Sequence, residues 1–75
     1  MTKIRKIRQL LEDLIFLKVI KDGDKATIEL EEGRLVVMLV IQKEEAREVI
    51  KYAFQEAFEN VETAEVSSIL QVKIF

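Results

Sequence analysis

Residues 15–42 read IFLKVIKDGDKATIELEEGRLVVMLVIQ, and this stretch contains the only two glycines of the chain, Gly23 and Gly33. Each glycine follows an acidic residue and separates two runs rich in apolar side chains; residues 25–31 alternate apolar and polar positions, whereas residues 35–41 are apolar throughout. Asp-Gly between such runs is a strong signal for a β-hairpin, because both central residues of a type I′ turn need a positive φ, and Glu-Gly is a weaker version of it. The stretch therefore predicts three antiparallel strands, at about 15–21, 24–31 and 34–42.

The two turns support each other, because each fixes a register and both registers select the same buried face. The pairs brought together on that face are Val19 with Ala26, Leu17 with Ile28, Ile15 with Leu30, Leu30 with Leu35, Ile28 with Val37, and Ala26 with Leu39. A competing interpretation extends the first helix to Lys21 and uses Gly23 as its left-handed C-terminal cap.

Helical spacing of apolar residues predicts a first helix from Thr2 to about Asp13 and a second from Lys43 to about Asn60. The alternation from Thr63 to Phe75 predicts one final strand. The resulting fold class is α+β, a two-layer αβββαβ sandwich with a three-stranded meander, a final edge strand parallel to the central third strand, and both helices on one face. The longer first helix would give αββαβ instead.

Length and composition limit the function of the chain. Its 75 residues predict a single small domain over 1–75, and it has no cysteine or histidine. The common zinc sites, thiol nucleophiles and histidine-activated serines are therefore unavailable, and we expect neither an enzyme nor a bound cofactor or metal. The net charge of −2 and the lack of a long apolar run favour a cytoplasmic protein without membrane contact. The charge-rich, proline-free composition suits a thermophilic or a designed protein.

Three segments superficially suggest chemistry. Asp22-Gly23-Asp24 offers only two carboxylates to calcium, so a turn is the better interpretation. The glutamates in 44–48 could bind magnesium, but Arg47 and Lys51 are spaced to form ion pairs with them. The serines at 67–68 have no histidine or nucleophile elbow to activate them. Each segment is therefore predicted to be structural.

The sheet face turned away from the helices is the first candidate site. In the predicted register it carries apolar side chains on three of its four strands, and a contiguous apolar patch commonly marks a partner surface. The predicted interface residues are Phe16, Ile20, Val36, Met38, Val40, Ile69 and Phe75. The leading hypothesis is a non-enzymatic assembly or adaptor module that forms a homodimer through this face, with another protein as a further partner class. The alternative is a monomer whose surface carries scattered apolar residues that have no partner.

The second candidate is a basic cluster in the first helix, consisting of Lys3, Arg5, Lys6 and Arg8. Cations at the amino end of a helix oppose its dipole, which is a reason to suspect a function such as nucleic-acid binding. The four side chains spread around the helix, and no aromatic residue is interleaved with them. We therefore keep a small nucleic-acid-binding regulator as the alternative function, behind self-association.

Overall fold

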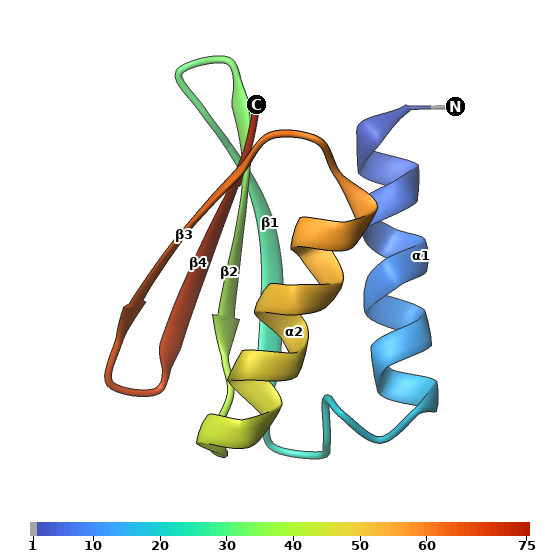
Figure 1. The fold of residues 1–75 in the computed structure, drawn as a ribbon, viewed down its shortest axis with the longest axis vertical. Coiled ribbons are helices and arrows are strands. Elements are labelled where there is room, and N and C mark those ends of the chain that lie inside the picture. The colour runs from blue at the N-terminus through green and yellow to red at the C-terminus, as the bar shows by residue number, and fades with distance from the viewer. Residues whose placement is uncertain (1) are drawn as a thin grey trace.

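The computed structural model describes residues 2–75, and these residues form two helices and one four-stranded antiparallel sheet (Figure 1). The elements are α1 (Lys3–Phe16), β1 (Lys25–Glu31), β2 (Arg34–Val40), α2 (Glu44–Ala57), β3 (Val61–Val66) and β4 (Ile69–Ile74). Their order is αββαββ, and the strands lie in the order β1-β2-β4-β3. The α+β class is confirmed, whereas the predicted αβββαβ order is wrong at two places.

The first difference is at the end of α1. The helix continues to Phe16 and then reverses at Lys18, which has a φ of 66°. The amides of Val19 and Ile20 both donate to the carbonyl of Leu14, at 2.9 and 3.1 Å, and this closes the helix end. The strand predicted at 15–21 is therefore wrong. The longer-helix alternative is closer, although the left-handed cap is Lys18 rather than Gly23.

Asp22-Gly23 forms a turn, but not the predicted hairpin. The amide of Asp24 donates to the carbonyl of Lys21 at 3.0 Å, and only Gly23, at 93°, has a positive φ. A positive φ at the second central residue alone is the pattern of a type II turn, which does not match the twist of two paired strands. The turn instead leads from the end of α1 into β1.

The Glu32-Gly33 hairpin is confirmed in every detail of its register. Both turn residues have a positive φ, 51° and 79°, as a type I′ turn requires. Leu30 pairs with Leu35, Ile28 with Val37 and Ala26 with Leu39.

The second difference is in the carboxy-terminal segment, where the single strand predicted at 63–75 is wrong. The segment folds at Ser67-Ser68 into the β3–β4 hairpin, in which Val66 pairs with Ile69. A strand of 13 residues would extend about 43 Å, but the longest dimension of the molecule is 29 Å. β4 lies beside β2, as predicted for the final strand, but it runs antiparallel to β2 and is an interior strand of the sheet rather than the predicted edge strand.

Both helices cover the same face of the sheet, as predicted (Figure 1). α2 contacts β3 and β4, and α1 packs beside α2. The core between the layers consists of Ile7, Leu14 and Ile20, the α2 side chains Ile50 and Phe54, the adjacent Phe58, and the inward residues Val37, Leu39, Ile41, Leu70, Val72 and Ile74. The opposite face of the sheet has no covering element among residues 2–75.

Candidate functional site

The uncovered face of the sheet, called the open face below, is the first candidate site. Cross-strand register arranges its side chains in four rows, because paired residues project to the same side. From β1 across to β3 the rows are Lys25–Val40–Ile69–Val66, Thr27–Met38–Gln71–Ala64, Glu29–Val36–Lys73–Glu62, and Glu31–Arg34 followed by Phe75.

Apolar side chains gather at one end of the open face. Ile69 is 41% exposed and Val66 is 72% exposed, while the neighbouring Val40 and Met38 are half-buried. Val36 also belongs to this face but is buried within its own chain. Four of the predicted interface residues, Val36, Met38, Val40 and Ile69, therefore do share one surface.

The other end of the open face is more polar and includes the predicted residue Phe75. The guanidinium of Arg34 lies over the Phe75 ring, 4.6 Å from its centroid. The positive charge is attracted to the face of the aromatic ring. Lys73 projects beside them on the same strand face, and Glu29 and Glu62 lie at the two edges of its row. This end of the open face thus has cations on its central strands and carboxylates on its edge strands.

Two predicted interface residues lie elsewhere. Phe16 is the last residue of α1 and is 82% exposed to solvent, away from the sheet. Ile20 is only 7% exposed and belongs to the core on the helix side. Both were assigned to the open face through the strand predicted at 15–21, so the correction follows directly from the longer α1.

The basic cluster of α1 is partly occupied by contacts within the chain. Lys3 Nζ donates to the carbonyl oxygen of Phe75 at 2.7 Å. Lys6 Nζ lies over the Phe58 ring, 4.8 Å from its centroid. Arg5 and Arg8 are exposed, and at about 100° per residue they project from the side of the helix opposite to Lys3 and Lys6. The structure therefore brings together no compact row of four cations.

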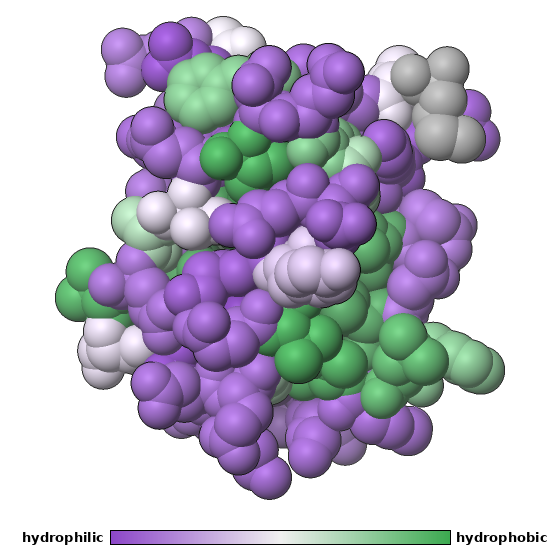
Figure 2. Space-filling model, viewed as in Figure 1, coloured by the Kyte–Doolittle hydropathy of each residue, from purple (hydrophilic) through white to green (hydrophobic). Residues whose placement is uncertain are grey.

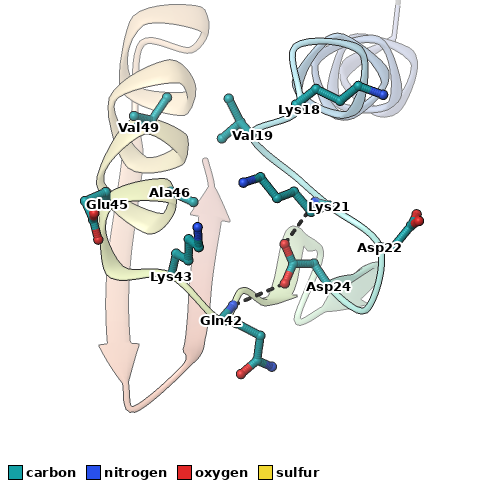
Figure 3. A pocket seen from close by; sticks show the side chains of 10 residues that line it. All are labelled: Lys18, Val19, Lys21, Asp22, Asp24, Gln42, Lys43, Glu45, Ala46 and Val49. Atoms are coloured by element: carbon teal, nitrogen blue, oxygen red, sulfur yellow. Dashed lines mark hydrogen bonds between the residues drawn. The ribbon is translucent and has the colours of Figure 1, made fainter.

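A crevice of about 370 Å³ lies between the α1–β1 loop and the start of α2 (Figure 3). Its walls include Val19 and Val49, and Lys21 and Lys43 extend across its opening. The Asp24 carboxylate in its floor accepts the backbone amides of Lys21 and Gln42, at 3.0 and 3.2 Å. Because this carboxylate is engaged with backbone, it serves to hold the two loops together rather than to act on a ligand.

The strongest polar cluster joins α2 to β3. Glu65 accepts hydrogen bonds from Arg47 Nε at 2.6 Å and from Lys51 Nζ at 3.0 Å. These bonds, the one from Arg47 first, lower the pKa of Glu65. Glu48 and Glu65 in turn raise the pKa of Lys51. Arg47 also donates to the carbonyl of Ile41 at 2.6 Å, so the cluster fixes the β2–α2 loop against the sheet edge.

The segments that superficially suggested chemistry have structural partners. Glu48 pairs with Lys51 at 2.6 Å, as the spacing predicted, whereas Arg47 pairs with Glu65 of β3. Within residues 2–75, no group of acidic side chains is arranged to hold a metal ion. Ser67 and Ser68 form the β3–β4 turn rather than lying within a strand. Neither helix of the described chain is long and apolar enough to cross a bilayer.

Sequence reasoning missed a second group of exposed apolar side chains, on the helix side. Figure 2 shows a green patch at the lower right, over the region where α1 ends beside α2. Exposed apolar residues at the end of α1 and on α2 include Phe16, Leu17, Val49 and Tyr52. Val49 was predicted to be buried with the α2 stripe, but it is 48% exposed. The α1 part of this group was missed because the prediction ended the first helix at about Asp13.

Comparisons with protein-family models, with curated proteins and with solved structures found no match to this chain. Its function must therefore be argued from its surfaces.

Proposed function

We propose that the protein is a non-enzymatic assembly module that pairs with a second copy of itself through the open face. The observation that carries the proposal is the apolar end of that face, where Val40, Ile69 and Val66 form one cross-strand row beside Met38. Both helices pack on the other side, so no element of residues 2–75 covers this row. We therefore infer that another molecule covers it.

A second copy fits the open face because the apolar row is self-complementary. A two-fold axis parallel to the strands, between β2 and β4, places Val40 of each copy against Ile69 of the other. The same axis places Arg34 of each copy against the Phe75 ring of the other, where cation and ring attract. It also sets Glu29 of each copy opposite Glu62 of the other, and this like-charge contact weakens the dimer. Two sheets stacked in this way pack about 10 Å apart with strands aligned to within about 30°.

The area of the open face sets the strength of this pairing. Four strands about 4.8 Å apart, each six or seven residues long at about 3.3 Å per residue, cover roughly 400 Å². Two such faces bury about 800 Å² as flat area and more when side-chain relief is included. Specific interfaces usually bury about 1,200–2,000 Å². We therefore expect a dimer near the lower limit, which dissociates on dilution.

A charge in the apolar row tests the proposal. Ile69→Lys places an ammonium group opposite Val40 of the second copy, so we expect light scattering to give half the mass of the unaltered chain, with an unchanged circular dichroism spectrum. Tyr52→Lys is the matched control, because Tyr52 is an exposed apolar residue on α2, and its mass should not change. Should Ile69→Lys unfold, Met38→Lys probes the adjacent row. Loss of assembly in the control as well, or retention in both open-face variants, would overturn the proposal.

Nucleic-acid binding through α1 is the weaker alternative, because Lys3 and Lys6 already have partners in the chain. It predicts a shift of duplex DNA in a gel at low salt that weakens as salt is raised. Under the assembly proposal, no such shift is expected, and Arg5→Glu leaves the oligomeric mass unchanged.

A further inference from the structure

We propose that β1 provides a second self-association site, at which it pairs antiparallel with β1 of a second copy and joins the two sheets into one of eight strands. This site lies at the sheet edge, not on the open face, and its pairing does not depend on pairing there. Three features carry the inference: a free strand edge, exposed apolar side chains next to it, and a register in which the charges match.

The free edge follows from the β1–β2 hairpin. Its two-residue turn closes at the pair Glu31–Arg34, where a hydrogen bond spans the turn. Antiparallel residues alternate between those that bond the neighbouring strand and those that face away from it. Counting back from Glu31, the outward N–H and C=O groups are those of Leu30, Ile28 and Ala26. Since β1 is an edge strand, these groups meet no other strand among residues 2–75, and such an edge is a template for pairing.

The helix-side surface of β1 is poorly covered. Ile28 is half-buried, but Leu30 is 71% exposed although its side chain faces the helix layer. If a helix covered β1, the Leu30 side chain would be buried in the core. The exposure of Leu30 shows that α1 leaves the outer part of β1 open.

The outer flank of α1 adds further apolar surface above β1. Leu10 and Asp13 line a crevice against Ala57, so this side of α1 faces α2. At about 100° per residue, Ile4 and Ile15 project from nearly the opposite side. Because α2 lies over β3 and β4, that flank is the one toward β1. Ile4 is 40% exposed and Ile15 is 53% exposed, so pairing at β1 would bring two such flanks together.

Charge and strand overlap together select one register, because an axis at Thr27 also pairs Lys25 with Glu29 but aligns only residues 25–29. A two-fold axis at Ile28 pairs all seven residues of the strand, with Ile28 opposite itself. It places Lys25 opposite Glu31 of the second copy and Thr27 opposite Glu29, while Leu30 covers Ala26. Opposite charges across strands are favourable and like charges directly opposite are unfavourable. Moving the axis by one residue to Glu29 shortens the overlap and sets two carboxylates face to face.

The other edge strand does not offer this match. β3 contains Glu62 and Glu65 and no cation, and Glu65 is already bound by Arg47 and Lys51. Two paired copies of β3 would bring four carboxylates and no cation together at one seam. The edge at which a second copy pairs is therefore β1.

Mixed-label NMR tests the register directly. In an equimolar mixture of ¹³C-labelled and unlabelled chains, filtered spectra should show contacts between copies from Thr27 Hα to Glu29 Hα and from Lys25 Hα to Glu31 Hα. The amide hydrogens of Ala26, Ile28 and Leu30 should exchange slowly, because each is bonded to the second copy. Absence of these contacts at concentrations of roughly 1 mM, well above typical weak-dimer dissociation constants, together with fast exchange of the three amides, would overturn the proposal.

A proline substitution in β1 distinguishes pairing at this site from pairing at the open face. Leu30→Pro removes one outward N–H without removing a donor to β2, so we expect it to lose the intermolecular contacts and to keep its fold, while the control Leu30→Thr keeps the contacts. Ile69→Lys, on the open face, should retain them. If Leu30→Pro unfolds, Ile15→Lys charges the exposed flank of α1 and should abolish them instead. Contacts that persist in the folded Leu30→Pro or Ile15→Lys chain, or that vanish only in Ile69→Lys, would refute pairing at β1.

Discussion

The reversal after α1 makes a sharp prediction about stability, because it places a lysine where glycine is preferred. Lys18 has a φ of 66°, and its left-handed conformation lets the amides of Val19 and Ile20 reach the carbonyl of Leu14. A side chain with a Cβ pays for this conformation through a clash with the following carbonyl oxygen. We therefore expect Lys18→Gly to stabilise the protein, although it removes a charged side chain.

The size of the effect is the difference between two terms. Left-handed backbone costs a residue with a Cβ about 1–2 kcal/mol, and the greater freedom of glycine in the unfolded chain returns roughly 0.4–1 kcal/mol of this. The free energy of unfolding should rise by about 0.5–1 kcal/mol. For a domain of this size, 1 kcal/mol corresponds to a Tm change of roughly 4–8 °C, so Tm should rise by about 2–8 °C.

Thermal unfolding followed by circular dichroism measures this effect, at one fixed protein concentration because self-association raises apparent stability. Lys21→Gly is the matched control: it changes the same residue type three positions on, where φ is not positive. The control should lower the free energy of unfolding by roughly 0.4–1 kcal/mol. Equal destabilisation by both substitutions would refute the left-handed cap as the end of α1.

Three further substitutions test the core, the loop contact and the ion cluster. Phe54→Ala empties a fully buried site; at roughly 3–5 kcal/mol, it should consume much of the stability and lower the urea midpoint far more than Phe54→Leu, and equal midpoints would contradict the core assignment. Asp24→Ala leaves two backbone amides without their acceptor and should cost about 1–2 kcal/mol, a loss that Asp22→Ala should not reproduce. Because Arg47 and Lys51 lower the pKa of Glu65, its contribution is complete above the unfolded pKa and disappears as pH falls through the folded pKa. Glu65→Gln should therefore be less stable than the unaltered chain near neutral pH and approach it in acid, and a pH-independent difference between the two would count against the cluster.

The sequence predicts the central hairpin because two independent signals agree there. Glu32-Gly33 has the turn chemistry, and the alternation of residues 25–31 before it selects the register that brings Ile28 opposite Val37. The second helix is predicted equally well, since its apolar stripe leads to the buried Ile50 and Phe54. Where local turn preference and burial point the same way, the fold follows from pattern alone.

Asp22-Gly23 misleads because the same dipeptide serves two kinds of turn. Its hairpin form requires a strand before it, but Leu14 extends the buried stripe of α1 and carries the helix to Phe16. Burial of the helix face outweighs the local turn preference, which is weak by comparison. The Ser67-Ser68 turn was missed for a different reason. Ser67 adopts a positive φ of 56°, but no glycine marks this position in the sequence.

The sequence predicts the part of the open face that lies on β2. β2 is apolar on both faces, so its own pattern does not choose between them. The register set by the Glu32-Gly33 turn places Val36, Met38 and Val40 on the side away from the helices, and Ile69 joins them through its pairing with Val40. The exposed flank of α1 could not be foreseen in the same way. It depends on where the helix lies over the sheet, which is decided by packing against α2 rather than by the pattern of α1 itself.

The central claim, that a second copy covers the open face, is tested most directly by sedimentation equilibrium of the unaltered chain over a range of concentrations. We expect a mass above the 8.7 kDa of one chain that declines toward this value on dilution, and a lower mass for Ile69→Lys at every concentration at which the unaltered chain is assembled. A mass of one chain at every concentration, including those near roughly 1 mM where weak dimers form, would contradict the account.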